Sequence, residues 1–269
     1  AAATTRITVG TNIANIYFRH PFLCAASART LAEVAHGRTL LGLGMSHRGM
    51  LRALGIDMGD ARATLERYVA EVVATLGGAA GDGLLRAQPA RFPVPVYVAG
   101  NTVESAAVAG RVGAGLMPFL TPRSHLPVLL AAAHTAAAGR AGDDFGCVLS
   151  IPTFVSDDVA AARSAARYNL AFFSQLPNYR RQWRRAGWAA AMDALAAHWR
   201  SAGSRRAAAE LVPDSLVDEV CVLGDAAACR AGLAAFRAAG ATVPVLAVSP
   251  VNDARHDATR RAIVALAPA

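Results

Sequence analysis

Small polar residues and a histidine directly follow two apolar runs near the start of the chain. One run, residues 7–9, leads into Gly10-Thr11-Asn12-Ile13, and the next, which begins at Thr39, leads into Leu41-Gly42-Leu43-Gly44-Met45-Ser46-His47. The imidazole of His47 suits general acid–base catalysis or substrate positioning, because its ordinary pKa lies near neutrality. A loop histidine that only caps a helix or contacts solvent would occupy the same place, so position alone leaves both readings open.

A third place of this kind follows the apolar run 94–99. Ala99 is followed by Gly100-Asn101-Thr102, and a helix is predicted over residues 103–111. Backbone amides at the start of a helix suit a phosphate group. An ordinary helix cap explains the same three residues equally well.

The other histidines and the cysteines carry weaker signals. His20 stands between Arg19 and Pro21, where a helix begins. The histidines at positions 36, 134 and 198 fall on predicted helices and are expected at the surface. The sequence contains neither H-x-x-x-H nor C-x-x-C, so it predicts no metal site, and it lacks the G-x-S-x-G of many hydrolases. Buried free thiols of a reducing cytoplasm are expected for the four cysteines, Cys24, Cys147, Cys221 and Cys229.

Strands and helices alternate along the chain to position these residues. Six continuous apolar runs predict parallel strands that are covered on both faces: 7–9, 39–43, 94–99, 116–117, 147–155 and 243–248. Predicted helices lie between them, and acidic residues begin three of these helices: Asp60, Asp158 and Asp225. This order fits an α/β barrel or a doubly wound open sheet, although a closed (β/α)8 barrel needs eight strands. No G-x-G-x-x-G opens a helix, so the dinucleotide-binding sheet lacks its usual sign.

Composition limits the partners of the chain. Its 269 residues are 54% hydrophobic and 17% charged, which favours a single domain over residues 1–269. All 27 basic residues are arginine, and the net charge of +8 would attract an anionic ligand. We expect no nucleic-acid partner, no membrane span and a cytoplasmic location. A long segment at residues 177–213, rich in arginine and tryptophan, precedes the last strand and could form a lid or a subunit contact.

Several of these strings resemble the luciferase-like monooxygenase superfamily, and within it the coenzyme F420-dependent oxidoreductases of actinobacteria. The resemblance covers nearly the whole chain, and the first two strings are its most specific part. The matching segments are residues 6–17 with Arg19-His20-Pro21, residues 41–48, Leu176-Pro177-Asn178-Tyr179, and the Gly224-Asp225 helix up to position 241.

The resemblance implies a (β/α)8 TIM barrel that binds a flavin-type ring at the carboxyl ends of its strands. Thr11 and Asn12-Ile13 match the place where relatives often have a non-prolyl cis peptide against the ring. Met45, Ser46 and His47 match a loop beside the ring, and some relatives carry a catalytic carboxylate at the position of His47. Ala99, Gly100, Asn101 and Thr102 match the loop that approaches the phosphate and ribityl side of the cofactor.

The strings match the third and fourth strands of such barrels, so the first two βα units of relatives have no counterpart here. The resemblance implies hydride transfer between the deazaflavin of F420 and a small organic substrate, with His47 as the catalytic residue, and a homodimer. An FMN-dependent monooxygenase of the same fold is the close alternative. A cofactor-binding remnant without turnover is a third reading, because the missing loops carry site residues in several relatives.

Overall fold

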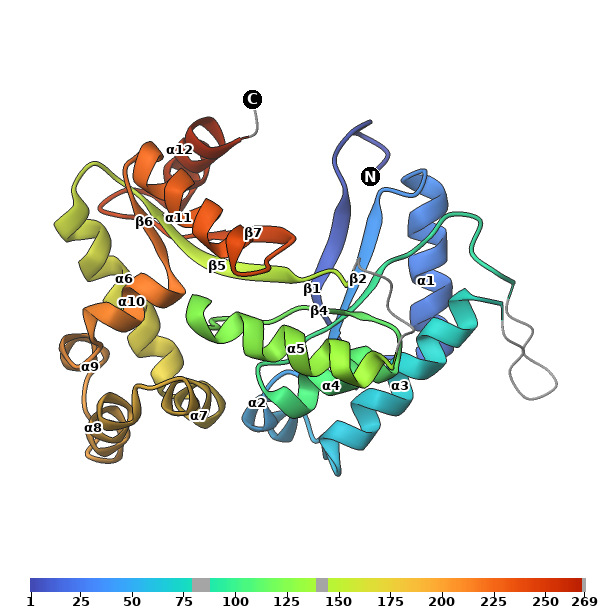
Figure 1. Ribbon diagram of the computed structural model, residues 1–269, viewed down its shortest axis with the longest axis horizontal. Helices are drawn as coiled ribbons and strands as arrows, with labels where there is room; N and C mark the ends of the chain where they lie inside the picture. Colours follow the sequence, from blue (N-terminus) through green and yellow to red (C-terminus); the bar gives the residue numbers. More distant parts are fainter. Residues whose placement is uncertain (79–87, 139–144, 268–269) are drawn as a thin grey trace. The chain divides into compact units, whose positions relative to one another are not determined.

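The chain forms an α/β protein with parallel strands, as predicted. The structure is a computed structural model that describes residues 1–78, 88–138 and 145–267 (Figure 1). Two compact units make it up. Unit 1 comprises Ala1–Pro118 and Leu129–Cys147, and unit 2 comprises Phe119–Val128 and Val148–Ala269. The single domain over residues 1–269 stays a prediction.

Unit 1 is built on a parallel sheet in the order β1-β2-β3-β4. Its strands are β1 (Val9–Asn15), β2 (Thr39–Gly44), β3 (Val96–Val98) and β4 (Gly115–Leu116). The helices that follow them are α1 (Pro21–Val34), α2 (Arg48–Ala53), α3 (Ala61–Leu76) and α4 (Val103–Arg111), and α5 (Leu126–Ala137) belongs to this unit from Leu129 onward.

The helices of unit 1 begin and pack as their sequences predict. The Asp60 carboxylate accepts hydrogen bonds from the backbone amides of Arg62 and Ala63, which caps α3. The apolar stripe of α3 is turned inward, and Leu65 and Val69 are fully buried in the core of the unit. Local capping and helical periodicity therefore turn one face of α3 into the core of unit 1, beside α1.

Unit 2 is built on a parallel sheet in the order β6-β5-β7. Its strands are β5 (Val148–Val155), β6 (Val222–Gly224) and β7 (Val243–Val248). Its helices are the 3₁₀ helix η1 (Arg123–His125), α6 (Val159–Ser174), α7 (Pro177–Arg185), α8 (Ala189–Arg200), α9 (Arg205–Glu210), α10 (Asp214–Val220), α11 (Ala226–Ala238) and α12 (Arg255–Leu266). Asp158 and Asp225 cap α6 and α11, as the sequence predicts, and the segment 177–213 forms helices α7 to α9.

Two strand predictions need correction. The described residues contain seven strands rather than six, because β6 begins two residues after the end of α10 and its apolar residues continue those of that helix; it pairs with β5. The first strand also begins and ends later than predicted. Ile7 is 61% exposed and lies outside β1, whereas the string from Gly10 to Ile13 lies inside the strand.

Two further sequence-based expectations can be compared with the structure. All four cysteines are buried free thiols, as predicted. Among the described residues, no helix is both long enough and apolar enough to cross a membrane.

Candidate functional site

The carboxyl ends of β1, β2 and β3 bring predicted site residues from three separate strings together. A Cβ atom added to Gly44 would lie 2.9 Å from Cβ of Ala99 and 3.0 Å from Cγ1 of Ile13. The backbone amide of Ala99 donates a hydrogen bond of 2.8 Å to the carbonyl of Leu43. Ile13 and Ala99 therefore meet over the glycine that ends β2, as converging strand ends predict.

Within β1, the register changes at the residues predicted to face a ring. Thr11 pairs with Leu41 and Ala14 with Leu43, with an irregularity between the two pairs. The peptide bond between Asn12 and Ile13 lies in that irregularity and is cis, as the resemblance implies.

The Thr11 side chain holds this part of β1 against β2. Its hydroxyl donates a hydrogen bond of 2.8 Å to the Gly42 carbonyl and accepts one of 3.1 Å from the Gly42 amide. The hydroxyl proton of Thr11 is therefore used within the sheet. The role that the structure indicates for Thr11 is to position β1 against β2.

The loop after β2 carries the predicted catalytic histidine. Ser46 adopts a left-handed backbone with φ of 62°, and its hydroxyl lies 3.8 Å from Sδ of Met50. Met45 packs against the core of unit 1. His47 occupies the N-cap position of α2 without a side-chain capping hydrogen bond, and it is half-buried.

Burial lowers the pKa of His47 below its ordinary value of 6.5 by removing water from the imidazolium form. Burial therefore favours the neutral imidazole over the imidazolium form. In that state it offers one nitrogen as a proton acceptor and the other as a donor.

The loop after β3 forms a helix cap. The Thr102 hydroxyl accepts a hydrogen bond of 3.2 Å from the Ser105 amide, and the Ser105 hydroxyl accepts one of 3.0 Å from the Thr102 amide. This reciprocal pair is a capping box, so the helix-cap reading is right for Thr102. Cofactor binding by Ala99, Gly100, Asn101 and Thr102, with the phosphate at the amides of the last three, stays a prediction.

His20 is also a cap, as its position before Pro21 predicts. Its Nδ1 accepts a hydrogen bond of 3.2 Å from the Phe22 amide at the start of α1. His20 and His47 thus occupy the same helical position, and only His20 uses its side chain to cap the helix.

Asn15 is a further candidate binding residue, which the sequence alone does not indicate. It ends β1 and pairs with Gly44, and its Oδ1 accepts a hydrogen bond of 2.9 Å from the Tyr17 amide. Its Nδ2 is buried and has no hydrogen-bond partner, although an unsatisfied buried donor is costly. The only signal in the sequence is that Asn15 lies two residues beyond Ile13, the spacing that returns a strand to the same face.

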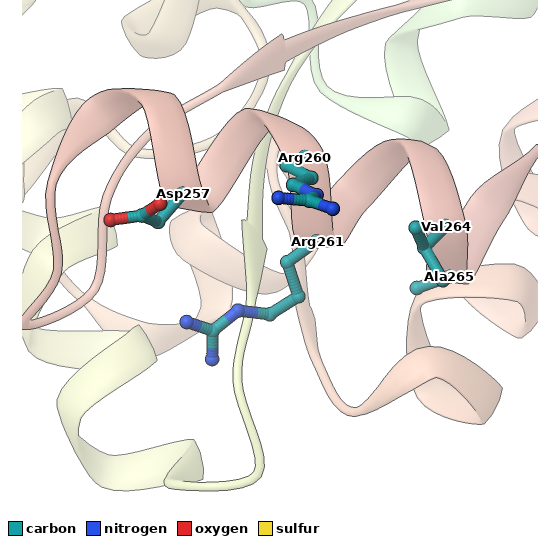
Figure 2. A pocket seen from close by; sticks show the side chains of 5 residues that line it. All are labelled: Asp257, Arg260, Arg261, Val264 and Ala265. Atoms are coloured by element: carbon teal, nitrogen blue, oxygen red, sulfur yellow. The ribbon is translucent and has the colours of Figure 1, made fainter.

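A pocket outside the strand ends lies on α12. Figure 2 shows its five lining side chains, all from that helix, and none of them is a predicted site residue; Arg261 also pairs with Asp253 at 2.7 Å.

Among the described residues, no group of three or more histidine, cysteine, aspartate or glutamate side chains is arranged to hold a metal ion. The strand ends of unit 1 are therefore the candidate site.

The fold and the sequence together define a class of protein. Residues 1–243 match the family described as luciferase-like monooxygenase. The chain belongs to this family, whose members include oxidoreductases and monooxygenases.

Individual relatives and solved structures are similar to this chain over most of its length. A protein of Mycobacterium tuberculosis assigned by its name to the coenzyme F420-dependent oxidoreductases is 26% identical, over 94% of this chain and 82% of that protein. The F420-dependent tetrahydromethanopterin reductase of Methanopyrus kandleri has a similar fold, with a TM-score of 0.75, 19% identity and coverage of 97% of this chain and 83% of that one. So does the oxygenating constituent of 3,6-diketocamphane monooxygenase from Pseudomonas putida, solved with FMN, with a TM-score of 0.64, 17% identity and coverage of 99% and 80%.

Proposed function

We propose that this chain is an F420-dependent oxidoreductase that transfers a hydride between the deazaflavin and a small organic substrate. The observation that carries the proposal is the half-buried position of His47 in the loop directly after β2, whose end lies between Ile13 and Ala99. The mycobacterial relative named as F420-dependent supports the same cofactor. The net charge of +8 also favours a cofactor with anionic phosphate and glutamate groups.

The residues at the strand ends fit a flavin-type ring. Ile13 and Ala99 supply apolar side chains on either side of Gly44, and the Nδ2 of Asn15 supplies a hydrogen-bond donor without a protein partner. The carbonyl groups of a flavin-type ring can accept a hydrogen bond from Nδ2 of Asn15, and the flat face of the ring can pack on the Ile13 and Ala99 side chains. We assign the binding of the ring to Ile13, Ala99 and Asn15, with support from the Asn12, Met45 and Ser46 backbone.

When bound, the deazaflavin supplies or accepts the hydride, so the chain has to orient the substrate and handle the accompanying proton. In the oxidation direction, the neutral imidazole of His47 accepts the proton of the substrate hydroxyl. The hydride leaves the carbon atom that bears this hydroxyl. In the reduction direction, the imidazolium of His47 returns that proton to the new alkoxide oxygen.

An FMN-dependent monooxygenase is the second candidate. The description of the family and the similar fold of a monooxygenase solved with FMN favour it. Both cofactors have a tricyclic ring, so the strand-end residues alone do not separate them. A homodimer, which the resemblance implies, is part of the proposal for either enzyme.

Titration of the purified chain with F420 and with FMN separates these functions. Cofactor fluorescence gives the affinities, and F420 reduction is then assayed with a panel of small alcohols. Preferential F420 binding with turnover is expected. Preferential FMN binding with oxygen consumption would favour the monooxygenase, binding without turnover would favour a cofactor-binding remnant, and binding of neither would refute both enzymes.

A further inference from the structure

Exposed apolar side chains follow all three strands that end at the candidate site. Phe18 lies three residues beyond the end of β1 and is 52% exposed. Met50 lies six residues beyond the end of β2, and Val103 lies five residues beyond the end of β3; each is 44% exposed. Because β1, β2 and β3 are parallel neighbours in one sheet, the segments that follow them leave the same edge of unit 1.

The Met50 side chain is directed toward the loop that holds His47. Its Sδ lies 3.8 Å from the hydroxyl of Ser46, the residue directly before His47. Long side chains on a helix generally point back toward its amino end. Here that end is His47 itself, which is the N-cap of α2. Met50 therefore lies beside the loop that carries the proposed catalytic imidazole.

Helix α2 separates its apolar side from its charged side. Leu54, the C-cap of α2, lies one turn beyond Met50 and is 58% exposed. Side chains at this spacing lie on one face of a helix, with Cβ atoms about 5–6 Å apart. Arg48 and Arg52 each stand two residues from Met50, which is about 200° around an α-helix. The two arginines thus lie on the other side of α2, and Met50 and Leu54 form an apolar side.

These side chains are exposed although the segments that carry them are held in place. Leu51 is fully buried and anchors α2, and its carbonyl accepts a hydrogen bond of 2.9 Å from the Ile56 amide. The Phe18 amide donates a hydrogen bond of 3.3 Å to the Asn15 carbonyl. Exposed apolar surface on an ordered backbone costs free energy in water, and a bound apolar group recovers it.

We propose that four side chains form an apolar substrate surface: Phe18, Met50, Leu54 and Val103. The substrate is an alcohol, or the corresponding carbonyl compound, whose remaining part is an alkyl chain. The chain lies along Met50 and Leu54, because an unbranched thioether adapts to chains of different shape.

The inference rests on the proposed function and adds the substrate class to it. With the alkyl chain on this surface, the hydroxyl group reaches His47. The hydroxyl proton passes to the imidazole, and the hydride passes from the carbon that bears the hydroxyl to the deazaflavin. The carbonyl compound is the product.

The test compares two variants that each lose two exposed apolar side chains of unit 1. One is Met50→Gln with Leu54→Gln. Its control is Leu31→Gln with Val34→Gln, two exposed residues at the carboxyl end of α1, near the start of β2 and so at the opposite edge of the sheet. F420 reduction is measured with primary and secondary straight-chain alcohols from propanol to octanol. Calorimetry measures the binding of octanol to each protein without F420, and thermal unfolding verifies that the variants are folded.

With the unchanged protein, we expect kcat/KM to rise about two- to fourfold for each added methylene group, because each group leaves water when it lies on the apolar surface. In Met50→Gln with Leu54→Gln, the rise should fall below about 1.5-fold for each group, and kcat/KM for propanol should change less than about threefold. Octanol should bind at least about fivefold more weakly to this variant. The control should behave as the unchanged protein does.

A kcat/KM that does not depend on chain length in the unchanged protein would overturn the apolar surface and leave the proposed function intact. Equal losses in the two variants would do the same, and so would equal losses for propanol and octanol in the first. If no alcohol reduces F420, the proposed function fails and octanol binding alone decides the surface. Weaker binding in the first variant only would then support it, whereas no binding, or equal binding by the three proteins, would overturn it.

Discussion

The segments that follow β2 and β4 each contain a left-handed residue but have different surroundings. Each contains a non-glycine residue in the left-handed region, Ser46 with φ of 62° and Leu120 with φ of 54°, and each is followed by a histidine whose pKa burial lowers. After β4, the Leu120 carbonyl takes two side-chain donors and the adjoining Thr121 is 1% exposed. After β2, Ser46 and His47 stay half-buried. The left-handed residue is thus enclosed by buried side-chain donors in unit 2, whereas the residues of the unit 1 loop stay partly exposed.

Substitution of His47 should have the largest effect, because we propose that the β2 segment carries the chemistry. In His47→Ala we expect kcat to fall about 10²- to 10⁴-fold, the usual contribution of general acid–base catalysis. The Kd for F420 should change less than about threefold. Steady-state kinetics and fluorescence titration measure the two quantities.

His20→Ala is the matched control for this substitution. It also removes a histidine from a helix N-cap, and it should cost about 1 kcal/mol of stability through the lost cap while turnover is kept. Equal losses of turnover and of cofactor affinity in His47→Ala would contradict the catalytic role, and so would no loss at all.

Gly42→Ala tests how closely the strands of the candidate site must approach. A Cβ atom at this position would collide with the backbone oxygen of Thr11 and with Sδ of Met117, and the backbone oxygen cannot move without breaking the β1–β2 pairing. We expect a loss of roughly 3 kcal/mol in the free energy of unfolding, as overpacking a core typically costs. Urea denaturation measures it.

Gly49→Ala provides the control for a glycine in the same unit. No atom lies within 4 Å of the added Cβ, and the residue is helical in α2, so alanine should be neutral or stabilise by up to about 1 kcal/mol. Similar stabilities of the two variants would show that the strands do not need the close approach at Gly42.

Trp183→Phe tests the closed side of the comparison. The substitution removes one of the two donors to the Leu120 carbonyl and leaves Gln182 in place, so the carbonyl keeps a partner. We expect a stability loss of about 1–2 kcal/mol and no change in kcat. Trp188→Phe, which loses only the bond from a half-buried indole to the Ser215 hydroxyl, should cost less than about 0.5 kcal/mol. A large fall in kcat with Trp183→Phe would mean that the β4 segment serves catalysis as well.

The sequence predicts the features that depend on neighbouring residues and misses those that depend on distant ones. Asp158 and Asp225 can be identified as caps because the carboxylate and the amides it binds lie within three residues of each other. Strand β6 is missed because it begins two residues after the last residue of α10, so the apolar residues of the helix and of the strand run together in the sequence. The bond between Gln182 and Leu120 joins positions 62 residues apart, so only the folded chain shows it. The strand-end strings are recognisable because glycine and small polar residues after apolar runs form a local pattern.

The pH dependence of stability and of turnover should distinguish the role of His47 from that of His125. We expect smaller effects here than in the three predictions above. Burial lowers the pKa of both below 6.5, so the unfolded chain binds protons more readily than the folded chain as the pH falls through 6.5. Both histidines therefore destabilise the fold in acid, and either His→Gln substitution should reduce the loss of urea midpoint between pH 7.5 and pH 5.5. Turnover should differ: only His47 has to be neutral to accept a proton, so the acid limb of kcat/KM should have its midpoint below pH 6.5 and persist in His125→Gln. An acid limb that moves in His125→Gln would place the second histidine in the reaction as well, and the two segments would then share the chemistry.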